Sequence, residues 1–131
     1  MREEEKLARD VYITLGERWN TPVFTNISRA ESNHMRAIAG LIGRYGFPDP
    51  VEDNTVGVFQ DPHFTELYES LVADGLKSID DAYDVGRRIE ELDIADLDEA
   101  LERTQNESIR RVYQNLRRAS ENHLRAFTAG R

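Results

Sequence analysis

The chain contains no cysteine. This absence excludes disulfide bonds, zinc sites built on thiolates, iron–sulfur clusters and a thiol nucleophile. Any bound metal ion would therefore need oxygen and nitrogen ligands. The sequence also lacks an apolar run long enough to span a membrane, and its first residues do not have the pattern of a signal peptide. We therefore expect a cytoplasmic protein.

Basic residues are also scarce, because 17 Lys and Arg stand against 25 Asp and Glu, which gives a net charge of -8. This balance argues against a nucleic acid or an anionic membrane as partner, since both carry negative charge themselves. The length of 131 residues suits one domain over residues 1–131 with a continuous core.

Helical periodicity of apolar residues marks four long segments. They run from about Arg2 to Arg18, Val23 to Tyr45, Ser78 to Leu97 or beyond, and Asn106 to Thr128. A short helix is predicted from Pro62 to about Asp74, because Asp61 and Pro62 form a typical N-cap and first turn. Residues 47–60 are predicted to be irregular and contain Pro48 and Pro50.

These segments predict an all-α fold, in which two antiparallel helical hairpins are joined by a long crossover that contains the short helix. A four-helix bundle with one long connection accounts for this spacing. An up-down-up-down bundle is the alternative, but it would have short loops throughout, and the segment from 47 to 77 is too long for that.

Several polar residues share the phase of the apolar stripes, if each residue turns the helix by about 100°. Glu31 lies at the centre of the apolar face of its helix, and His34 lies one turn further on. His123 has the phase of the apolar residues in the last helix, whereas Glu121 points away from them. These positions predict that Glu31, His34 and His123 point into the core.

The other two long helices also place acidic residues on their inner faces. In the first helix, Glu4 shares the phase of the apolar residues, while Glu3 and Glu5 diverge to either flank. In the third long helix, Glu90 and Asp93 flank the buried side and, at positions i and i+3, can address one point. We therefore expect Glu4 to be the inward acid of the first helix.

Six candidate metal ligands follow from this placement: Glu4, Glu31, His34, Glu90, Asp93 and His123. Burial of four carboxylates without countercharge would cost several kcal/mol each, or would force them to bind protons. Two divalent cations would neutralise them. Carboxylate and imidazole ligands together suit iron, manganese or zinc better than calcium, and iron or manganese fits best.

Four strings in this chain resemble one family. They are residues 3–12, 30–35, 86–94 and 120–127, which contain EEEKLARDVY, AESNHM, GRRIEELDI and SENHLRAF. This family is a branch of the ferritin-like superfamily known as domain of unknown function 2202 (DUF2202). The resemblance implies a ferritin-like four-helix bundle with a di-metal site, in which two helices each supply one carboxylate and two supply a Glu-x-x-His pair.

The candidate ligands match this pattern at Glu4, Glu31, His34, Glu90 and His123. The chain departs from it at Ser120, where the second Glu-x-x-His would have its glutamate. Either Asp93 replaces the missing carboxylate or water takes that coordination position.

The resemblance implies redox chemistry of the ferroxidase, peroxidase or oxidase type, with dioxygen or peroxide as the oxidant. A rubredoxin-type relay requires cysteine, so electrons would come from an external donor or from the substrate itself. The alternative is a helical interaction module, with or without metal, that has no catalytic turnover. A homodimer formed through a helix face is compatible with either function.

Overall fold

The structure is a computed structural model that describes residues 2–46 and 53–129. These residues form five α-helices and no strand, which confirms the predicted all-α fold. The helices are α1 (Arg2–Trp19), α2 (Pro22–Arg44), α3 (Pro62–Gly75), α4 (Ile79–Arg103) and α5 (Glu107–Ala129). Pro48 and Pro50, which were expected to keep the connection irregular, lie outside the described residues. Residues 1 and 130–131, which belong to the expected single domain, also lie outside them.

Two of the helices, α3 and α4, begin at the residues that the sequence favours as caps. The Asp61 side chain accepts a hydrogen bond from the backbone N–H of His63 at 2.9 Å, directly before Pro62 starts α3. The Ser78 hydroxyl accepts one from the N–H of Asp81, also at 2.9 Å, at the start of α4. Such caps satisfy N–H groups that have no partner within the helix, so they fix where each helix begins.

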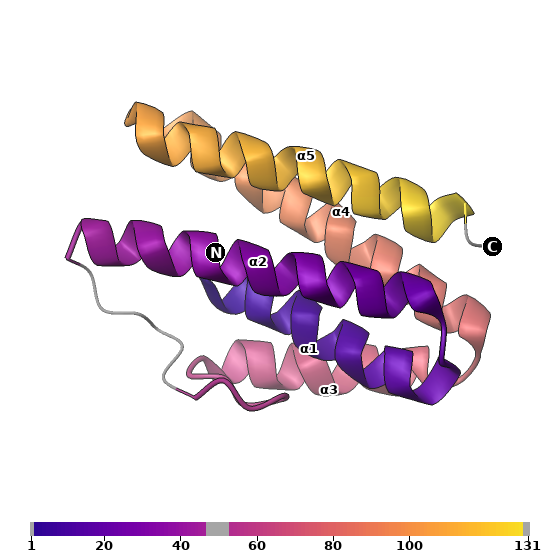
Figure 1. Ribbon diagram of the computed structural model, residues 1–131. Helices are drawn as coiled ribbons and strands as arrows, with labels where there is room; N and C mark the ends of the chain where they lie inside the picture. The colour runs from indigo at the N-terminus through magenta and orange to yellow at the C-terminus, as the bar shows by residue number, and fades with distance from the viewer. Residues whose placement is uncertain (1, 47–52, 130–131) are drawn as a thin grey trace.

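The long helices pack as two antiparallel hairpins, α1 with α2 and α4 with α5 (Figure 1). The connection between the hairpins contains α3, which packs against α1 and α4. Figure 1 shows that this connection leads back along the length of the molecule, so that α2 and α4 run in the same direction. Further contacts, of α1 with α4 and of α2 with α5, bring all four long helices together.

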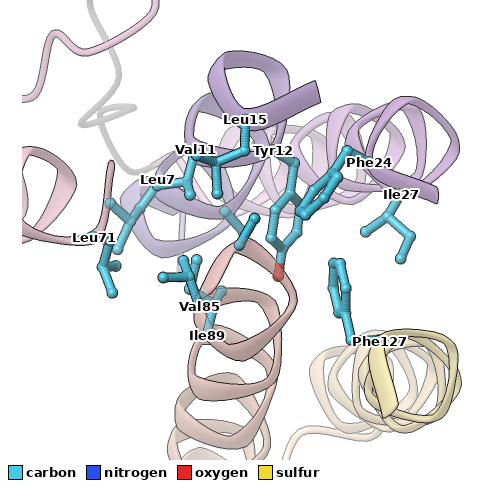
Figure 2. Packing of buried hydrophobic residues seen from close by; sticks show 12 residues of the cluster. Leu7, Val11, Tyr12, Leu15, Phe24, Ile27, Leu71, Val85, Ile89 and Phe127 are labelled. Atoms are coloured by element: carbon cyan, nitrogen blue, oxygen red, sulfur yellow. The ribbon is translucent and has the colours of Figure 1, made fainter. Parts of the chain in front are cut away.

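Two apolar clusters fill the core. The larger one joins all five helices and includes Leu7, Val11, Tyr12, Leu15, Phe24, Ile27, Leu71, Val85, Ile89 and Phe127 (Figure 2). The smaller one contains Ile38, Leu97 and Leu116. Burial of each large apolar side chain contributes about 1.5–3 kcal/mol. Along α2, α4 and α5, the buried polar residues fall between the members of these two clusters, so a polar layer lies between two apolar ones.

Gly86 allows close packing of α4 and α5. A Cβ atom at this position would lie 2.6 Å from a ring carbon of Phe127, which is closer than side-chain carbons pack. The absence of a side chain lets α4 lie close to Phe127 and to the hydroxyl of Tyr12, which is 3.5 Å from the Gly86 carbonyl oxygen. This approach positions the next turn of α4, which carries Glu90.

Candidate metal centre

Glu31 lies at the centre of the polar layer and is completely buried. Its two carboxylate oxygens face two different histidines. Oε2 lies 3.2 Å from Nδ1 of His34, one turn further along α2, and Oε1 lies 3.3 Å from Nδ1 of His123 on α5. One carboxylate therefore belongs to two groups of polar atoms.

Each group adds one more carboxylate. In the first group, Glu5 of α1 places Oε2 3.2 Å from Nδ1 of His34. In the second group, Glu90 of α4 places Oε1 3.4 Å from Nδ1 of His123. Within each group the potential ligand atoms all lie within 4.8 Å of one another. The two imidazole rings stack with their centroids 5.8 Å apart, so the two groups are neighbours.

These distances fit a metal ion in each group. Ligand atoms about 2.1 Å from an ion, at angles between tetrahedral and octahedral, lie about 3.0–3.4 Å apart. In the second group, Oε1 of Glu31, Oε1 of Glu90 and Nδ1 of His123 are buried and have no hydrogen-bond partner in the described structure. Buried polar atoms rarely stay without a partner, so this group suits a cation that binds all three atoms.

Four of the six residues expected at the site come together in these groups: Glu31, His34, Glu90 and His123. Asp93 is buried beside them but belongs to neither group, and its Oδ2 atom has no hydrogen-bond partner. Ser120 is also buried in this layer.

The expectation that Glu4 is the inward acid of the first helix is wrong. Glu4 is only partly buried, whereas Glu5 is 1% exposed and contacts His34. The reason is that α1 packs against α3 and α4 on one side and against α2 on another. Its apolar stripe, centred on Val11, therefore faces α3 and α4 instead of the bundle axis (Figure 2). Glu5 has the phase of Tyr12, seven residues later, and Tyr12 does face the axis.

Burial of the centre shifts the pKa values of its acids. Burial raises the pKa of Glu31 well above its ordinary value, and the negative charges of Glu5 and Glu90 raise it further. The pKa of Asp93 is raised for the same reasons. Burial by itself also raises the pKa of Glu5, but hydrogen bonds with Glu31 and His34 outweigh it, and the pKa of Glu5 is lowered. Burial in the absence of cations thus favours the protonated forms of Glu31 and Asp93 and the ionised form of Glu5.

Tyr12 orients Glu90, although the sequence alone favours simple core packing for Tyr12 over a role beside the candidate ligands. Its buried hydroxyl donates a hydrogen bond to Oε2 of Glu90 at 2.5 Å. This bond leaves Oε1 of Glu90 to face His123. Burial, followed by the negative charge of Glu90, raises the pKa of Tyr12 well above its ordinary value, so the hydroxyl keeps its proton.

A second buried polar cluster, which we call the loop-facing cluster, lies on another face of α1 and consists of Lys6, Arg9 and Asp10. The Lys6 ammonium group contacts Asp10 at 2.6 Å and the carbonyl oxygens of Thr55 and Val58 at 2.7 Å each. Arg9 also binds Asp10, at 2.8 Å. These bonds attach the crossover to α1 and leave the cluster satisfied by the protein alone.

Comparisons with known proteins agree with this fold. The family model described as "Uncharacterized protein domain (DUF2202)" matches residues 1–130. The chain is 53% identical, over 127 residues, to the uncharacterized protein MJ0754 of Methanocaldococcus jannaschii, and the match covers 97% of this chain and 69% of that protein. The chain therefore belongs to the DUF2202 family, as its sequence motifs predicted.

A solved structure is similar over the same length. It is the crystal structure of the hypothetical protein MJ0754 from Methanococcus jannaschii DSM 2661, which matches with a TM-score of 0.96 over 97% of this chain and 73% of that one. In the part of the chain described here, no helix is both long and apolar enough to cross a membrane.

Proposed function

We propose that this protein is a ferritin-like di-metal carboxylate protein that binds two divalent ions, with iron preferred and manganese or zinc as alternatives. The proposal rests above all on one observation, namely that the two oxygens of Glu31 face two separate donor groups. Two antiparallel hairpins joined by one crossover support the ferritin-like assignment, since such bundles hold metal sites between facing helices.

The balance of charge favours two ions over one. Four acids are buried in the polar layer: Glu5, Glu31, Glu90 and Asp93. When ionised they carry four negative charges, which two divalent cations neutralise. An uncompensated buried charge costs several kcal/mol, so the ionised cluster needs both ions. The mixture of carboxylate and imidazole donors suits iron, manganese and zinc.

In this proposal each residue of the centre has a defined role. Glu5 and His34 hold the first ion, Glu90 and His123 hold the second, and Glu31 binds both. Tyr12 keeps Glu90 in the orientation that directs Oε1 to the second ion. The apolar clusters on either side exclude water. Because Ser120 replaces a carboxylate, either Asp93 or a small molecule completes the ligand set.

With two ferrous ions bound, the centre would supply two electrons, one from each ion, to an oxidant such as dioxygen or peroxide. The protein has no cysteine from which to build its own electron relay. The electrons would therefore come from ferrous iron as substrate or from an external donor.

Metal analysis tests this proposal. Protein loaded with ferrous iron without oxygen, and then desalted, should retain two equivalents per chain, and X-ray scattering at the iron, manganese and zinc edges should identify the ions. On exposure to air, oxidation of ferrous iron should be faster than in buffer. Less than about half an equivalent of metal would refute the proposal. Two equivalents without faster oxidation would instead identify a metal-binding module that has no turnover.

A further inference from the structure

Two eight-residue strings in the two halves of the chain repeat each other. They are AESNHMRA at residues 30–37 on α2 and ASENHLRA at residues 119–126 on α5. Five of the eight positions are identical, and Met35 corresponds to another large apolar residue, Leu124. Each string contains one histidine of the candidate centre. The two hairpins therefore supply their histidines from the same local sequence, and the two strings can be compared position by position.

The strings differ in the order of one acid and one serine. Glu31 and Ser32 on α2 correspond to Ser120 and Glu121 on α5. Each residue turns a helix by about 100°, so neighbours that exchange places point in different directions. Glu31 is completely buried, whereas Glu121 is partly exposed and is paired with Arg117. On α5 the inward position is therefore held by a serine, Ser120, which is also buried.

The packing of α4 against α5 places an acid opposite Ser120. The two helices run antiparallel, so a step forward along one is a step back along the other (Figure 1). Their register is given by the contacts of Gly86 with Phe127 and of Glu90 with His123. Asp93 comes three residues after Glu90, and Ser120 comes three residues before His123. Asp93 therefore lies opposite Ser120, and the acid that α5 lacks at this level is present on α4.

The α1–α2 hairpin has the reverse arrangement. There Glu5 contacts His34, and the same spacing of three residues places the completely buried Ala8 opposite Glu31. This hairpin thus has a small residue on its first helix and an acid on its second. The α4–α5 hairpin has the acid on its first helix and the small residue on its second. Each hairpin therefore keeps one buried acid at this level, but the acid has changed helices.

Asp93 has no partner that accounts for its burial. It is 3% exposed, and its Oδ2 atom has no hydrogen-bond partner in the described part of the chain. Three atoms of the second donor group share this state, namely Oε1 of Glu31, Oε1 of Glu90 and Nδ1 of His123. Buried polar atoms without a partner are rare, so a ligand shared by these atoms would explain all four.

We propose that Asp93 is a ligand of the second ion and replaces the acid that α5 lacks at Ser120. This inference rests on the proposed function, because it needs a metal centre to complete. In the structure Asp93 belongs to neither donor group, so its side chain has to turn when the ion binds, and no hydrogen bond of Oδ2 opposes this. The second ion then has one carboxylate more than the first, so it should bind more tightly and fill first.

The test moves the acid back to α5. The double variant Asp93→Ala/Ser120→Glu gives the α4–α5 hairpin the arrangement of the α1–α2 hairpin. Metal-free protein is titrated with Mn²⁺ in a calorimeter without oxygen. Groups that only orient a ligand contribute about 10–100-fold to affinity, so Asp93→Ala alone should weaken the second ion by about 100-fold or more. The double variant should recover most of this loss.

A matched control adds the same charge to the outer face of α5. Asn122 is exposed and lies two residues from Ser120. The variant Asp93→Ala/Asn122→Glu has the same net charge as the test variant, but it should bind the second ion as weakly as Asp93→Ala does. Diffraction at the manganese edge from crystals of Asp93→Ala should locate the remaining ion between Glu5 and His34, in a chain that is still folded.

Three results would overturn the role of Asp93. Unchanged affinity of Asp93→Ala for both ions would mean that another group completes the ligand set. A remaining ion beside His123 would mean that Asp93 serves the first ion. Failure of Ser120→Glu to recover the loss, or equal recovery by Asn122→Glu, would mean that positions 93 and 120 do not serve one ion. A wild-type protein that binds neither Mn²⁺ nor iron would instead refute the proposed metal centre itself, which is a distinguishable result.

Discussion

Two buried polar clusters to which α1 contributes residues differ in how their charges are satisfied. In the loop-facing cluster, the Asp10 carboxylate is held by Lys6 and Arg9, and it also accepts a hydrogen bond from the N–H of Gly57. In the candidate metal centre, the partners of Glu31 and Glu90 are histidines, a tyrosine and other carboxylates. On one face, α1 thus supplies the cationic side chains of Lys6 and Arg9. On the other face, it supplies the acid Glu5 to the candidate metal centre.

This difference indicates that the loop-facing cluster stabilises the fold, whereas the other cluster is suited to binding cations. A polar network that is complete within the protein stabilises one arrangement of the chain, so its loss is costly. A cluster of acids that lacks cations is unfavourable until ions arrive. Loss of one charge should therefore have opposite effects on the stability of the metal-free protein in the two clusters.

The largest effect is expected from Glu31→Gln, because Glu31 belongs to both donor groups. The variant should retain less than half an equivalent of metal, whereas the wild type should retain two. Without metal it should melt at a higher temperature than the wild type, since glutamine does not need to take up a proton on burial, whereas the raised pKa of Glu31 makes its burial unfavourable at neutral pH. Metal analysis and calorimetry measure both quantities. Glu121→Gln, which changes a surface acid paired with Arg117, serves as control and should keep two equivalents.

The opposite sign is expected in the loop-facing cluster. Lys6→Met should lower the free energy of unfolding by about 3–5 kcal/mol, because it leaves a buried carboxylate and two carbonyl oxygens short of a partner. Urea unfolding of the metal-free protein measures this change, and the variant should still bind two ions. If Lys6→Met and Glu31→Gln shift stability in the same direction, the contrast between the clusters is wrong.

A smaller effect is expected from Tyr12→Phe, which removes only the hydroxyl that orients Glu90. Groups that hold a metal ligand in place typically contribute 10–100-fold to affinity. We expect a loss of about this size for the second ion alone, with the first unchanged, in a calorimetric titration with Mn²⁺. Equal weakening of both ions would indicate a general effect on packing.

The smallest effect is a pH dependence of the metal-free protein. Burial raises the pKa of Glu4 from 4.5 to about 7, and the pKa values of Glu31 and Asp93 are raised as well. The folded state therefore holds protons that the unfolded state has already lost, so stability should fall as pH rises from about 4.5 through 7. Melting temperatures across this range should decrease without metal, and two equivalents of Mn²⁺ should make the decrease smaller, because the ions replace the proton on Glu31 but do not bind Glu4. A rise instead would contradict this assignment of charges.

The sequence predicted most of the helical framework because its signals are local. Asp61 and Ser78 cap their helices with side chains a few residues away, and the start of α4 agrees with the predicted one. The inward position of the candidate residues on α2, α4 and α5 was also predicted correctly, because each of these helices has its apolar stripe towards the bundle axis. The phase of the stripe was then a sufficient guide to Glu31, Glu90 and His123.

The first helix could not be interpreted in the same way. Its burial depends on α3 and on the segment around Thr55 to Val58, whose position is set by tertiary contacts. Periodicity alone therefore selected Glu4 in place of Glu5. It also could not show that Lys6 and Asp10, which are charged residues one turn apart, are completely buried.

In the proposed metal centre, the shared position of Glu31 has a consequence for how metal would be taken up. An ion in one donor group restricts the rotation of the Glu31 side chain and so prepares its other oxygen for the second ion. Uptake should therefore be cooperative, and chains with a single ion should be rare at half saturation. Such a protein would respond to the concentration of free metal more steeply than two independent sites could.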